Sequence, residues 1–164
     1  MRTLVFLCSL FLLAFSVVNL HRVLPIPITL QEFSPEVIMV LKELKVPEDR
    51  IKELASSISL ASRITGFSPT LLASLAYTES GFSLTAVSKK GYKGIMQTPY
   101  ATKKYTEIDV LLGARILEEK YKIAKGDMHL ALALYKGGDN PLAHRQAKEV
   151  IVLCLKLQEK QRRT

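Results

Sequence analysis

The sequence predicts one mainly α-helical domain with little or no sheet, preceded by an N-terminal apolar segment. Three observations lead to this prediction. An uncharged apolar run stands near the start of the chain. Helix start signals then recur, each before a segment whose apolar residues repeat with the helical period. The one alternating segment, residues 129–136, consists mainly of leucine and alanine, which favour a helix over a strand.

Residues 1–22 are predicted to be a signal peptide or a membrane anchor. Residues 3–20 contain no charged side chain and follow Arg2, and a basic start before an apolar run is typical of an export signal. Ser16 ends a small-residue pattern that offers a cleavage site. The run also approaches the ~18 residues of a spanning helix, so a retained membrane tether remains an equal alternative. Either case predicts an exported protein of the periplasm or cell envelope, anchored to the inner membrane in the second.

A linker is expected at residues 23–33, where two prolines occur, and the domain at residues 34–164. Ser34 and Pro35 are a cap and first-turn pair that begins a helix. A second helix follows Pro47 and keeps its apolar period until Gly66.

A third helix begins at Ser68 and Pro69, and Gly81 is expected to end it in the left-handed conformation. Residues 83–105 contain two glycines, a proline and several lysines, and predict a loop with a short helix or two. The spacing of Thr106 and Asp109 resembles a capping box before a fourth helix.

Asp127 is expected to cap the helix that contains the alternating segment. Asn140 and Pro141 begin a last helix of about twenty residues, which ends in a basic tail. The chain therefore offers six helical segments after the apolar run.

Glu79 stands at the end of the third helix and continues an apolar stripe. The stripe has the spacing i, i+3, i+4, i+7 and consists of Leu72, Leu75, Ala76 and Glu79. Burial raises the pKa of a carboxyl group, and the negative end of a helix opposes its ionised form. Both effects suit a general acid. A solvated helix end, or a pair with a nearby lysine, remains the alternative interpretation.

Three segments occur in an order that resembles the soluble lytic transglycosylase family. They are "ESGFSLTAVSKKGYKGIMQTP" from Glu79, "DVLLGARILEEKY" from Asp109 and "ALALYKGG" from Ala131. The resemblance covers residues 58–138. It implies a lysozyme-like helical domain that cleaves peptidoglycan, with glycan strands as its partner and no metal or other cofactor.

The resemblance also implies the site residues. The family's acid corresponds to Glu79, its sugar-contacting serine to Ser88 and its groove glutamine to Gln97. The full set of expected residues is Glu79 as the catalytic residue, with Ser80, Ser88, Met96, Gln97 and Tyr135 as substrate-binding residues. Packing is the alternative for the methionine and the tyrosine, and a plain turn for the serine at 88.

The chain departs from the family pattern in several places. Only Thr98 separates Gln97 from Pro99, and Lys136 and Asp109 each stand where asparagine is usual. These changes leave the shape of the groove and its sugar preference open. Gly113 matches the family's glycine that permits close helix packing.

No second carboxylate stands in a comparable motif, whereas glycoside hydrolases usually use two. In the family the 6-hydroxyl of muramic acid is the nucleophile, and a 1,6-anhydro product forms. Folding could still bring Glu107, Asp109 or Asp139 close to Glu79. A lysozyme-type hydrolase and a non-catalytic glycan-binding or envelope-complex protein therefore remain alternatives.

Composition limits the partners. Beyond residue 22 the chain has 21 basic and 15 acidic residues, a net charge of +6, which suits an anionic wall or membrane surface. Export argues against nucleic acid as a partner, and envelope machinery is a further candidate. Cys154 lies among aliphatic residues and is expected to be buried. The histidines show no ligand spacing, so no metal site is expected.

Overall fold

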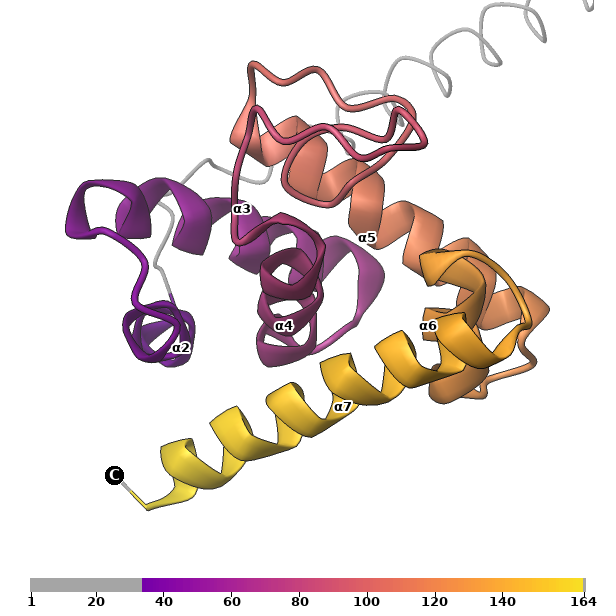
Figure 1. The fold of residues 1–164 in the computed structure, drawn as a ribbon. Helices are drawn as coiled ribbons and strands as arrows, with labels where there is room; N and C mark the ends of the chain where they lie inside the picture. The colour runs from indigo at the N-terminus through magenta and orange to yellow at the C-terminus, as the bar shows by residue number, and fades with distance from the viewer. Residues whose placement is uncertain (1–33, 164) are drawn as a thin grey trace, which may run out of the picture. The chain divides into compact units, whose positions relative to one another are not determined.

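A computed structural model describes residues 34–163, which contain six α-helices and no strand (Figure 1). The helices are α2 (Pro35–Glu43), α3 (Glu48–Thr65), α4 (Pro69–Ser80), α5 (Thr106–Ile123), α6 (Met128–Lys136) and α7 (Pro141–Arg162). The mainly α prediction is confirmed for this part of the chain. The predictions for residues 1–22 and 23–33 lie outside the described residues. None of the described helices is long and apolar enough to cross a membrane.

The ends of several helices follow the capping chemistry expected from the sequence. The side chain of Ser68 accepts a hydrogen bond from Leu71 N at the start of α4. Asp127 caps α6 and Asn140 caps α7 in the same way. Gly81 ends α4 in the left-handed conformation, with φ of 60°. Local side-chain chemistry therefore sets where these helices begin and end.

The predicted capping box before α5 is wrong. Thr106 is the first helical residue and Tyr105 is the cap, without a side-chain hydrogen bond. The carboxylate of Asp109 instead accepts hydrogen bonds from Thr102 N, at 2.8 Å, and Thr102 Oγ1, at 3.2 Å. Asp109 thus holds the loop that precedes the helix.

The short helices expected in residues 83–105 are also absent from the described structure. This segment contains turns and two isolated bridges, Val87 with Lys93 and Lys93 with Thr98. Positive φ angles at Gly91, Gly94 and Gln97 interrupt any helical run. The segment forms the long loop between α4 and α5 (Figure 1).

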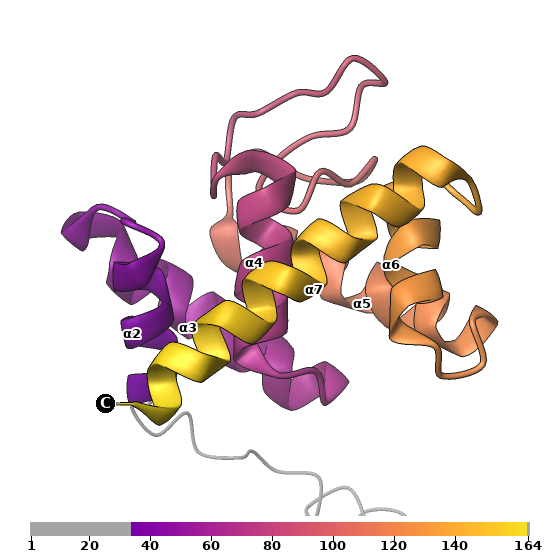
Figure 2. The ribbon, with the colours of Figure 1, turned by 60° about the horizontal axis from the view of Figure 1, so that its bottom comes forward.

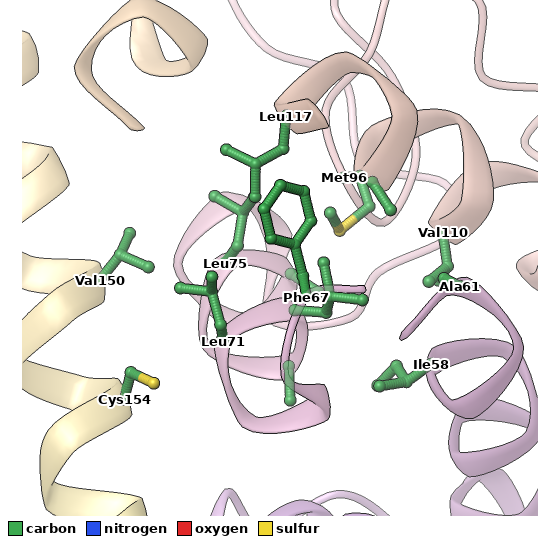
Figure 3. Packing of buried hydrophobic residues seen from close by; sticks show 14 of the residues in the cluster. Ile58, Ala61, Phe67, Leu71, Leu75, Met96, Val110, Leu117, Val150 and Cys154 are labelled. Atoms are coloured by element: carbon green, nitrogen blue, oxygen red, sulfur yellow. The ribbon is translucent and has the colours of Figure 1, made fainter. Parts of the chain in front are cut away.

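Helix α4 lies in the centre of the domain, in contact with α2, α3 and α7. Figure 2 shows the long α7 crossing α4 on its way from α6 to the C-terminus. In Figure 3, Leu71 and Leu75 of α4 lie between Ile58 on α3 and Val150 on α7. Every residue of α4 from Thr70 to Ala76 is buried, which explains why this part of the helix is apolar on almost every side.

Cys154 lies at the interface of α7 with α4 and is buried, as expected (Figure 3). It forms no disulfide with any residue between 34 and 163. Burial raises the pKa of its thiol, and a hydrogen bond with Ser74 offsets part of this rise. A thiol in such surroundings packs as a small apolar side chain and is a poor nucleophile.

Candidate active site

Glu79 lies in the last turn of α4, and its side chain is only 14% exposed. The other members of its stripe, Leu72, Leu75 and Ala76, are fully buried. The helical period predicted from the sequence therefore turns the carboxyl group inward. A freely solvated helix end is excluded by this burial.

The Glu79 carboxylate forms an ion pair with Lys136, the last residue of α6. Lys136 Nζ lies 3.0 Å from Glu79 Oε1 and 3.0 Å from Thr78 Oγ1, and its side chain is 6% exposed. Burial is the larger influence and raises the pKa of the Glu79 carboxyl group. The charge and hydrogen bond of Lys136 oppose that rise without cancelling it.

Sequence reasoning noticed Lys136 only as a departure from the family pattern and missed its contact with Glu79. A pair with a lysine was considered, but the two residues are far apart along the chain. One signal was present: the segment 130–135 is apolar apart from the tyrosine hydroxyl, and a lysine ends it. A charge that ends a buried helix needs a partner or access to water.

Tyr135, next to Lys136, donates a hydrogen bond from its hydroxyl to the Met96 carbonyl oxygen at 2.7 Å. Burial raises the pKa of this phenol well above its usual value, and the charge of Glu79 raises it further. The hydroxyl therefore stays protonated and acts as a donor. It connects α6 to the loop 83–105 rather than bonding Glu79 directly.

Ser80 also connects α4 to the loop. Its Oγ donates to the Ile95 carbonyl oxygen at 2.8 Å and accepts a hydrogen bond from Ser83 N at 3.1 Å. Both bonds are internal, so the serine after the acid holds the loop against the end of α4.

Met96 and Gln97 lie on the adjoining part of the loop. The Met96 side chain is 0% exposed and packs closely against Gly113 of α5, which corresponds to the packing alternative. Gln97 Nε2 donates to the Gly94 carbonyl oxygen at 2.9 Å and the Ala86 carbonyl oxygen at 3.3 Å. The amide oxygen of Gln97 has no such bond to the described residues and is available to a ligand.

Ser88 forms a turn with Tyr92. Its Oγ accepts a hydrogen bond from Tyr92 N at 3.0 Å, and its own N–H donates to the Tyr92 carbonyl oxygen at 2.8 Å. No hydrogen bond among the described residues joins Ser88 to Glu79. The structure thus connects Ser80 and Tyr135 to the loop 83–105 by hydrogen bonds at Ile95 and Met96, and it shows no hydrogen bond from Ser88 to these residues within the part of the chain that it describes.

The carboxylates proposed as possible partners of Glu79 make other contacts. Asp109 is fully buried and holds Thr102, whereas Asp139 pairs with His144 at 2.6 Å. Glu107 is exposed on the first turn of α5. None of the three is in contact with Glu79. Within residues 34–163 no cluster of side chains suits a metal ion.

A pocket of about 420 Å³ lies beside the end of α4. Its walls come from the turn between α2 and α3 and from the chain that follows Gly81; they include Arg50, Tyr77, Phe82 and Ser83. Arg50 donates to the Phe82 carbonyl oxygen at 2.8 Å and fixes this wall. Glu79, Gln97, Tyr135 and Lys136 are not among the residues that line this pocket.

Comparison with known protein families gives a match. A family model described as "Transglycosylase SLT domain" matches residues 56–150, which is more than half of the chain and spans α4 to α6 completely. No curated protein matches the chain. The chain therefore belongs to the transglycosylase SLT domain family, which indicates a lytic transglycosylase-type function on peptidoglycan.

Proposed function

We propose that the protein is an exported peptidoglycan lytic transglycosylase with Glu79 as its single acid and base. The bond cleaved is the β-1,4 linkage between N-acetylmuramic acid and N-acetylglucosamine, and the product is a 1,6-anhydromuramic end. The observation that carries this proposal is the buried carboxyl group of Glu79, whose pKa is raised, without a second carboxylate in contact with it.

In the first step the protonated Glu79 donates its proton to the glycosidic oxygen, and the bond from that oxygen to the anomeric carbon breaks. The 6-hydroxyl oxygen of the same muramic residue then bonds to the anomeric carbon. Its proton passes to the Glu79 carboxylate, which restores the starting state. No water is consumed, and proximity within one sugar replaces a positioned water molecule.

The remaining residues support two tasks in this proposal. We assign substrate contact to Ser88 and to the free amide oxygen of Gln97. Ser80, Met96 and Tyr135 hold the loop 83–105 against α4 and α6, through the hydrogen bonds and packing described above. Residues 3–20 would then export the domain or tether it to the inner membrane, on the side where peptidoglycan is found.

The test is digestion of purified sacculi followed by mass spectrometry of the fragments. We expect 1,6-anhydromuramic ends with the wild type and none with Glu79→Gln. Glu119→Gln, which changes an exposed carboxylate on α5, is the matched control and should retain activity. Ordinary reducing ends would identify a hydrolase, and the absence of any fragments would contradict the catalytic proposal.

A non-catalytic glycan-binding protein on the same fold is the second candidate. The Glu79–Lys136 ion pair favours it, because the pair engages the carboxylate before any substrate binds. In that case wild type and Glu79→Gln would bind sacculi equally and neither would release fragments.

A further inference from the structure

The ion pair between Glu79 and Lys136 joins the C-terminal ends of two helices. Glu79 lies in the last turn of α4, and Lys136 is the last residue of α6. The partial negative charge at a helix C-terminus disfavours a carboxylate and favours an ammonium group. The ammonium group of Lys136 therefore offsets the negative charge of the Glu79 carboxylate and of the two helix ends.

We propose that Lys136 is a positioning residue that holds the Glu79 carboxyl group in place and sets the alkaline limit of its action as an acid. The inference rests on the proposed function. It concerns a lysine at a position where the family pattern noted above has asparagine.

The geometry restricts both side chains. Lys136 Nζ bonds Glu79 Oε1 and Thr78 Oγ1, so two successive residues of α4 hold the same ammonium group. The ammonium bonds only Oε1 of the carboxyl group. We infer that the other oxygen, Oε2, is the one that gives and receives the proton.

The ion pair also serves the second half of the reaction. Burial favours protonated Glu79, as the acid step requires, but it opposes the carboxylate that remains afterwards. Lys136 stabilises that carboxylate until it accepts the proton of the attacking hydroxyl. An uncharged side chain at residue 136 would leave burial unopposed, so Glu79 would keep its proton to higher pH.

Other charged or titratable groups lie on α6 itself, on the loop 83–105 and on α3, which contacts α4. Burial and the charge of Glu79 raise the pKa of Tyr135 on α6, so this phenol stays neutral. Lys90 of the loop lies beside Gly137, because a Cβ atom on that glycine would be 3.9 Å from Lys90 Nζ. On α3, Arg50 bonds the Phe82 carbonyl oxygen. Within the described residues, no ion pair joins Tyr135, Lys90 or Arg50 to the Glu79 carboxylate, whose partner is Lys136.

The experiment is a titration of the Glu79 carboxyl carbon by NMR, assigned with Glu79→Gln, for the wild type, Lys136→Met and Lys136→Arg. We expect the midpoint in Lys136→Met to rise by about one pH unit or more, because an opposite charge in contact is lost. Lys136→Arg keeps the charge and should stay close to the wild type. Lys122→Met removes a lysine from an exposed ion pair with Glu118 and should leave the midpoint unchanged.

The pH dependence of sacculus digestion provides the second readout. The alkaline limit of kcat/KM should move upward in Lys136→Met by the same amount as the midpoint, and Lys122→Met should not move it. If Lys136→Met does not fold, Lys136→Asn carries the same test with the family residue. An unchanged or lower midpoint in a folded variant overturns the inference, whereas absence of digestion by every variant overturns only the proposed function.

Discussion

Gly113→Ala should destabilise the domain although alanine is the better helix former. Gly113 lies in the interior of α5, and a Cβ atom there would be 2.3 Å from Met96 Cβ, 2.6 Å from Met96 Cγ and 2.8 Å from Met96 Cε. Carbon atoms in contact normally lie about 3.5–4.0 Å apart. The nearest atom is fixed to the loop backbone, so a change of rotamer cannot remove the clash. The loop itself must retreat by about 1 Å.

The cost follows from these distances. Overpacking of a full core costs about 1–3 kcal/mol, and the closeness of backbone-fixed atoms places this site in the upper part of that range. Replacing glycine by alanine in a helix interior recovers about 1 kcal/mol. The net loss is about 1–2 kcal/mol in the free energy of unfolding, which lowers Tm by about 3–10 °C for a domain of this size.

Thermal unfolding followed by circular dichroism measures this difference. Glu119→Ala on the exposed face of the same helix is the control and should change Tm little. Digestion of sacculi should fall together with stability, because the Met96 carbonyl is the acceptor of Tyr135 Oη. A Tm for Gly113→Ala equal to or above that of the wild type would refute the packing argument.

Three further predictions concern Tyr135, Asp109 and Glu79. Tyr135→Phe removes the donor to the buried Met96 carbonyl and should lower the free energy of unfolding, measured by chemical denaturation, by about 1–3 kcal/mol. An unchanged free energy would show that this carbonyl finds another donor. Asp109→Ala removes the acceptor of Thr102 and should make residues 94–105 more sensitive to limited proteolysis. Asp109→Asn keeps an acceptor oxygen and should resist the protease. Equal cleavage of both variants would contradict this role. The folded-state pKa of Glu79 is raised, so its contribution to stability is present below the unfolded-state pKa and is lost as pH rises through the folded-state pKa. The Tm of Glu79→Gln should therefore improve relative to the wild type as pH increases, and a relative decline would show that the ion pair outweighs burial.

Local chemistry explains why so much of the fold could be predicted from the sequence. Ser68, Asp127 and Asn140 bond backbone groups only three residues away, so a short window of sequence contains the whole interaction. The helical period placed Glu79 on the apolar stripe but left a solvated helix end open, and the burial of its side chain in the structure decided between the two. Family membership was also visible, because it depends on the order of motifs along the chain.

Predictions that depended on distant partners did less well. Asp109 has the spacing of a capping box, yet its carboxylate bonds Thr102 across a turn of the preceding loop. Residues 83–105 were expected to include a short helix, but hydrogen bonds to other parts of the loop and positive φ angles produce turns instead. Such bonds are set by the path of the chain in space.

By itself, the sequence determined where the six described helices lie, where several of them end, and that a glutamate continues the apolar stripe of α4. Only the tertiary structure decided that the Glu79 side chain is buried and that its ion-pair partner is Lys136. Lys136 lies on another helix, and its ammonium group reaches Glu79 because α4 and α6 end at the same corner of the domain. The physical reason is the range of the forces: helical period and capping act within a few residues, whereas burial and charge depend on neighbours that folding brings together.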